Sequence, residues 1–162
     1  MGMPMKRISV VLIAGALLGL GVIPQAAADD VAVIVHKSNP IDGLTMGQLR
    51  KIGLGQEAKW PSGKKIAVLM TTPGQPERDS TLKIVCGMRE TDFTLHFMHA
   101  SFSGETADPP RAVGSGVQLR QSVVSTPNAV GFIKASQLDD SVKVITIDGS
   151  RPGEPAYKLK VK

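Results

Sequence analysis

The residue types best suited to chemistry gather in one segment, Thr71 to Thr81, which reads TTPGQPERDST. It joins a predicted strand to a predicted helix, and its second half contains Arg78, Asp79, Ser80 and Thr81. At a helix start several backbone N–H groups lack partners, and the helix dipole favours a negative charge. We therefore predict that these four residues form an anion-binding site. In the alternative interpretation, Asp79 or Ser80 only caps the helix and Arg78 is solvated.

Other reactive side chains form weaker patterns. His96 and His99 are three residues apart on a predicted helix, a spacing that can bring two imidazoles to one face. A metal site needs three or four ligands and His36 is the only other histidine, so copper or zinc binding stays an alternative to ordinary helix residues. The single cysteine, Cys86, lies in an apolar stretch and is expected to be a buried, unreactive thiol. No pattern indicates a metal centre, a cofactor or an enzyme.

The elements that position these residues alternate between strand and helix. Apolar runs predict strands, spacings of three and four predict helices, and Gly, Pro and hydroxyl residues mark the boundaries. Phe93, Phe97, Met98 and Phe102 are interpreted as one core-facing helix stripe. The alternation predicts an α/β fold with helices packed on a sheet. The strands are expected at 31–35, 66–70, 130–133 and 142–147, and the helices at 46–54, from Asp79 or Ser80 to Gly87, from Thr91 onward, and from Ser115 to Pro127.

The segment between Val35 and Ile66 has a recognisable order. An apolar strand runs into Ser38-Asn39-Pro40, Thr45 caps a short helix, and Trp60-Pro61-Ser62-Gly63 turns into the next strand. This order resembles the extracytoplasmic phosphate-binding proteins of ABC importers, in which a strand ending in N-P precedes a helix and a W-x-x-G turn. The segments at 102–104 and 128–133, FSG and NAVGFI, resemble that family's F-x-G and G-A-I-G-Y-V. We expect Trp60 to pack on the domain.

The resemblance implies a single periplasmic-binding-protein-like lobe with a mixed sheet, a phosphate or similar oxyanion ligand, and an ABC permease or other protein as partner. In the family an arginine precedes an S-G-T triplet at a helix start. Here Arg78 precedes Asp79-Ser80-Thr81, so the glycine is missing. The family's proteins are about twice as long and hold the ligand between two lobes, whereas this chain matches one. The alternative is an envelope interaction module that keeps the fold and has lost the ligand.

The N-terminus predicts export. Lys6 and Arg7 precede an apolar run from Ile8 to Val22, and Ala26-Ala27-Ala28 resembles a cleavage site. We predict a signal peptide over residues 1–28 and a periplasmic, soluble domain over 29–162, because the apolar run is shorter than the roughly 20 residues that span a bilayer. The 19 Lys and Arg against 14 Asp and Glu are scattered, with six aromatic residues, so nucleic acid is not an expected partner.

Overall fold

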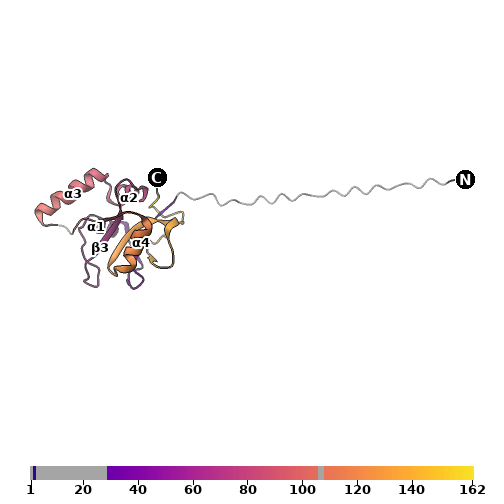
Figure 1. Ribbon diagram of the computed structural model, residues 1–162, viewed down its shortest axis with the longest axis horizontal. Coiled ribbons are helices and arrows are strands. Elements are labelled where there is room, and N and C mark those ends of the chain that lie inside the picture. Colours follow the sequence, from indigo (N-terminus) through magenta and orange to yellow (C-terminus); the bar gives the residue numbers. More distant parts are fainter. Residues whose placement is uncertain (1, 3–28, 106–107) are drawn as a thin grey trace.

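The computed structural model describes residue 2 and residues 29–105 and 108–162. The predicted signal peptide therefore lies outside the described residues, Gly2 excepted. The remaining chain forms an α/β fold, as predicted (Figure 1). Its strands are β1 (Val31–Val35), β2 (Gly43–Leu44), β3 (Ala67–Thr71), β4 (Arg111–Val113), β5 (Ala129–Lys134), β6 (Lys143–Val144) and β7 (Thr146–Ile147). Its helical segments are α1 (Met46–Gly53), α2 (Pro76–Thr81), the π-helix η1 (Leu82–Cys86), α3 (Glu90–Ser103), α4 (Gly116–Ser125) and the 3-10 turn η2 (Ala135–Gln137).

The sheet is mixed, and the three strands predicted to share it do so. Its order is β4-β3-β5-β1-β6, with β3 parallel to both β4 and β5, and β1 antiparallel to β5 and β6. The single strand predicted over 142–147 is interrupted instead. Ile145, fully buried, separates β6, which pairs with β1, from β7, which pairs with β2 in a second small sheet. The apolar run 142–147 thus contributes one strand to each of two sheets.

Each face of the sheet has its own core, because successive strand residues point to opposite sides. Val31, Val33 and Val35 of β1 face a cluster that contains residues of α1, η1 and α3. Ala32 and Ile34 face a smaller cluster with residues of α4. The helices therefore cover both faces, with α2 continuing into η1 on the first face and α4 on the second (Figure 1).

Local signals place several helix ends correctly. The Thr45 side chain accepts from the Gln48 N–H in a capping box, the Ser115 hydroxyl accepts from the Gln118 N–H, and Gly87 ends η1 in the left-handed conformation at φ 68°. The predicted helix start at Asp79 or Ser80 is wrong, because α2 begins at Pro76. Proline suits the first helical position, where its φ is already helical and its missing N–H is not needed.

The predicted core stripe of the following helix is only half correct. That helix, α3, begins at Glu90, so the start predicted at Thr91 is close. Phe93 and Phe97 are buried, but Met98 is 48% and Phe102 88% exposed. At about 100° per residue the two pairs point in different directions, and only the first faces the core. In Figure 1 the helix α3 projects beyond the sheet.

Two further observations bear on packing and topology. Trp60 is 6% exposed and its indole N–H donates to the Asn128 carbonyl at 3.0 Å, which confirms that it packs on the domain. Across residues 29–105 and 108–162, no helix combines the length and the apolar character needed to cross a bilayer.

Candidate functional site

The parallel strands β3, β4 and β5 end at the same edge of the sheet. From Thr71, the end of β3, the chain enters α2 on one face, whereas from Val113, the end of β4, it enters α4 on the other. Ligands of open α/β sheets bind outside the carboxyl ends of strands where successive connections leave to opposite faces. The two loops touch here, since the Thr72 N–H donates to the Val113 carbonyl at 3.0 Å. This edge is the candidate site.

The start of α2 offers few donors to a ligand. Its N-cap is Gln75, whose side chain makes no capping bond, and Pro76 at the first position has no N–H. Gly74 has φ 89°, and among the described residues no atom lies within 4 Å of where its Cβ would be. The loop from Thr72 to Gln75 thus presents the backbone of Gly74 at the surface, rather than a row of free amides.

Arg78 lies inside the molecule. Its side chain is 7% exposed, and its Nε and one terminal nitrogen donate to the two carboxylate oxygens of Glu90, each at 2.7 Å. The other terminal nitrogen donates to the Thr71 carbonyl at 2.9 Å, and the guanidinium lies 5.9 Å from the Phe93 ring centroid. The interpretation of Arg78 as a solvated side chain is therefore wrong. The guanidinium joins the end of β3 to the start of α3.

The other predicted site residues occupy the last turn of α2 and are not exposed together. Thr81 is fully buried and its hydroxyl donates to the Glu77 carbonyl at 2.7 Å. Ser80 is 5% exposed and its hydroxyl oxygen accepts from the Lys162 N–H at 3.3 Å. Only Asp79 faces solvent. The predicted location at the helix start is thus corrected, and ligand binding by Arg78, Asp79, Ser80 and Thr81 stays a prediction.

Two buried polar side chains near this edge were missed by sequence reasoning. Glu77 is 2% exposed and Thr71 is fully buried, and within the described part of the chain neither Glu77 Oε2 nor Thr71 Oγ1 has a hydrogen-bond partner. Glu77, Ser80 and Thr81 are three and four residues apart, so one face of α2 turns polar groups inward. The spacing of Glu77, Ser80 and Thr81 could have predicted this buried polar face, but only if Pro76 had been taken as the start of the helix.

The start of α4 is covered by side chains of the protein itself, which leaves no room there for a ligand. The Ser115 hydroxyl caps the helix, and the Gln137 side chain of η2 lies so close to Gly116 that a Cβ there would collide with it. Arg120 donates to the Gln137 carbonyl and pairs with Asp139 at 3.0 Å, which fixes this turn against α4. Of the two helices that start at the edge, only α2 leaves an open surface beside its first turn.

The histidines and the cysteine have ordinary surroundings. His96 Nε2 lies 2.9 Å from the Leu54 carbonyl, and its ring packs edge-on against Phe97. Across residues 29–105 and 108–162, no group of three His, Cys, Asp or Glu side chains could hold a metal ion. Burial raises the pKa of the Cys86 thiol to about 11, so little thiolate forms near neutral pH.

Comparison with known proteins points to one class. No family model matches the chain. A Clostridium perfringens protein described as a phosphate ABC transporter substrate-binding protein and solved with bound phosphate is 29% identical, with a TM-score of 0.62 over 76% of this chain and 46% of its own. An ABC-type phosphate transport receptor from Vibrio cholerae is 26% identical, with a TM-score of 0.63 over 76% and 48%. PstS from Borrelia burgdorferi, at 14% identity, shares the fold with a TM-score of 0.61 over 76% and 49%.

The fold is thereby identified. Over the 76% of the chain that these matches cover, the fold is that of a periplasmic-binding-protein-like lobe of the kind found in phosphate ABC transporter substrate-binding proteins, which confirms the predicted resemblance and fold class. The chain spans about half the length of the solved structures that it matches.

Proposed function

We propose that this chain is an extracytoplasmic solute-binding protein that recognises phosphate or a related oxyanion, with an ABC permease as its partner in import. The observation that carries the proposal is the position of Arg78 at the carboxyl end of β3, where its guanidinium contacts the Thr71 carbonyl beside the loop that leads from β3 to α2. The 29% identity to a protein solved with bound phosphate supports the same ligand class. Binding without catalysis, in the periplasm after loss of residues 1–28, completes the proposal.

An oxyanion at Arg78 has to compete with Glu90. The guanidinium already makes a two-point contact with that carboxylate, the geometry in which arginine also binds phosphate. Asp79 is exposed and can accept the proton of a monoprotonated phosphate, whereas Ser80 and Thr81 would first have to release the Lys162 N–H and the Glu77 carbonyl. Binding is therefore an exchange of partners within one charged cluster, and weak affinity is expected.

Two observations favour the alternative function, an envelope interaction module that keeps the fold without the ligand. Arg78 is neutralised by Glu90, and Pro76 removes a donor from the start of α2. Both features suit a domain in which the former ligand position has been closed by the protein's own side chains. The same experiment separates the two functions.

The test is the thermal shift and binding heat of the purified protein with phosphate, arsenate and sulfate. A ligand at 100 times its Kd adds about 2.7 kcal/mol to the free energy of unfolding. Replacement of Arg78 by Ala should abolish the shift. Glu90→Gln should enlarge it at a given phosphate concentration, because the competing charge is gone. Asp139→Asn, which disturbs the separate pair with Arg120, is the matched control and should leave the shift unchanged.

The result that contradicts oxyanion binding is equally specific. If the wild type and Glu90→Gln give no shift and no heat with any of the three anions at millimolar concentration, Arg78 and Glu90 form a structural pair only. The interaction-module function then replaces the binding function.

A further inference from the structure

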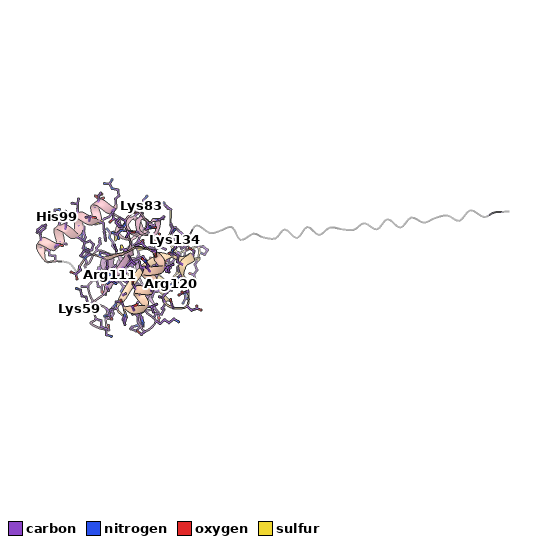
Figure 2. All side chains as sticks on the ribbon, viewed as in Figure 1. Lys59, Lys83, His99, Arg111, Arg120 and Lys134 are labelled. Atoms are coloured by element: carbon purple, nitrogen blue, oxygen red, sulfur yellow. The ribbon has the colours of Figure 1, made fainter. Side chains whose placement is uncertain are left out.

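Helix α3 carries apolar side chains that the rest of the chain leaves exposed. Leu95 is 47%, Met98 48% and Phe102 88% exposed. They are three and four residues apart, so they lie along one side of the helix, which we call the outer stripe. The buried Phe93 and Phe97 lie on the side toward the core. Figure 2 shows His99 on the half of α3 that projects from the rest of the molecule.

A cavity of about 280 Å³ lies beside the outer stripe. It is near the lower end of the range for small-molecule pockets, about 300 Å³, and has room for an aromatic side chain. Met98 belongs to both the cavity wall and the outer stripe, so the two adjoin. The rest of the wall is mixed. Its apolar residues are Phe93, Phe97, Pro109 and Pro110, and its polar residues are Arg78, Thr94 and Ser101.

We propose that a second copy of this chain binds here, with the two α3 helices antiparallel about a two-fold axis and Phe102 of each copy inserted into the cavity of the other. A two-fold contact uses the same surface on both partners, so that surface must contain both the protruding group and the recess that receives it. The outer stripe and its cavity meet this requirement, because Phe102 is exposed and the cavity is lined in part by residues of the same helix.

The spacing and the dipole of α3 favour a copy of itself as the partner. Alternating steps of three and four residues are the pattern by which two helices pack along a seam. The two carboxylates of α3, Glu90 and Asp92, are already paired within the chain with Arg78 and Arg89, so the seam carries no unpaired acidic group at that end. Antiparallel packing of two copies opposes the two helix dipoles.

The contact is small, because three exposed side chains and one cavity per copy contribute to it. Interfaces of this size belong to weak or transient complexes. A dissociation constant of about 10 μM to 1 mM is therefore expected. Arg78 also lines the cavity that receives Phe102, so the proposed contact borders the Arg78–Glu90 pair. Sedimentation without added phosphate therefore tests the association separately from oxyanion binding.

Sedimentation of the purified protein from about 10 μM to 1 mM tests the proposal. The wild type should pass from monomer to dimer, and Phe102→Asp should weaken the dimer at least about tenfold. Val124→Asp replaces a similarly apolar, 42% exposed side chain on α4 and should leave the dimer unchanged. Circular dichroism checks that both variants fold. A wild type that stays monomeric at 1 mM, or a dimer weakened by Val124→Asp and not by Phe102→Asp, overturns the proposal.

Cross-linking provides a second measurement that does not depend on a weakened variant. A short bis-maleimide should join two copies of Leu95→Cys and not two copies of Val117→Cys, whose site on α4 is 43% exposed. The native Cys86 is buried and does not compete. Equal cross-linking of both variants, or cross-linking of Val117→Cys alone, would place the contact elsewhere and overturn the proposal.

Discussion

Helices α2 and α3 are neighbours in the chain and have opposite distributions of polar residues. On α2, polar side chains face the interior, with Glu77, Ser80 and Thr81 all buried. On α3, apolar side chains face solvent, with Met98 and Phe102 exposed. The Arg78–Glu90 pair connects the two helices.

Both helices depart from the usual arrangement of a stable protein, in which apolar side chains are buried and polar side chains are exposed. Buried polar groups and exposed large apolar groups both cost stability, and natural proteins retain such departures mainly at functional sites. The departure on α2 lies at the carboxyl edge of the sheet, where a ligand is expected, and the departure on α3 lies at the periphery, where a partner is expected. The two proposals, binding of a solute and association with a second copy, thus concern consecutive α-helices.

The strongest test of the contrast compares two phenylalanines on α3. Phe97→Ala should reduce the free energy of unfolding by about 3–5 kcal/mol, because a large buried side chain is removed from the core. Phe102→Ala, at the exposed position, should change it by less than about 0.5 kcal/mol in dilute protein. Urea unfolding at low micromolar concentration measures both. Similar losses in the two variants would mean that Phe102 also packs within the monomer.

The second test concerns the connection between the helices. Arg78→Ala should cost about 3 kcal/mol, because it leaves Glu90 and the Thr71 carbonyl without their charged donor. The Glu90 side chain is 29% exposed, so water partly replaces the lost partner and larger losses are not expected. Lys65→Ala breaks the exposed pair with Asp108 and should cost less than 1 kcal/mol. Equal costs in urea unfolding would show that the buried pair is no stronger than the surface pair.

Stability at alkaline pH tests the packing of η1, the π-helix that follows α2. Burial raises the pKa of Cys86 from 9.0 to about 11. Between these values the unfolded chain loses the thiol proton while the folded chain keeps it, so stability falls by up to about 1.4 kcal/mol per pH unit. Burial also raises the pKa of Tyr157, which adds a fall above about pH 10. Cys86→Ala should flatten the dependence between pH 9 and 10, as measured by unfolding free energies, and an unchanged slope would contradict this assignment.

The parts of the fold that local chemistry specifies could be predicted from the sequence. Thr45 and Ser115 cap their helices by bonds to residues three positions later, and the continuous apolar run Val31–Val35 is typical of an interior strand. The start of α2 was mispredicted because Asp79 and Ser80 resemble caps, although Pro76 at the first position was the stronger signal.

The candidate site could be located but its contacts could not. The segment from Thr71 to Thr81 does lie at the expected end of β3, because strand-to-helix loops in such sheets have a fixed place. The pairing of Arg78 with Glu90 depends on how η1 and the left-handed Gly87 turn the chain back toward α2. No local sequence pattern predicts this course of the chain. Arg78 was therefore expected to bind a ligand, whereas in the structure it pairs with the Glu90 carboxylate.

The smallest expected change in the free energy of unfolding concerns two buried threonines, and its sign should differ between them. Thr71 Oγ1 is buried without a hydrogen-bond partner among the described residues, whereas the Thr81 hydroxyl donates to the Glu77 carbonyl. Replacing a buried hydroxyl with a methyl group of similar shape removes a desolvation cost in the first case and a hydrogen bond in the second. Thr71→Val should therefore raise the free energy of unfolding by about 1 kcal/mol, and Thr81→Val should lower it by about 1 kcal/mol.

Urea unfolding of the two variants measures this difference directly. Valine is also favoured in strands, which adds to the expected gain at the end of β3. If Thr71→Val lowers stability as Thr81→Val does, an ordered water satisfies the Thr71 hydroxyl, and the inward face of α2 is a hydrated polar network. If it raises stability and also removes the response to phosphate, the unpaired hydroxyl has been retained for the ligand at the cost of folding energy.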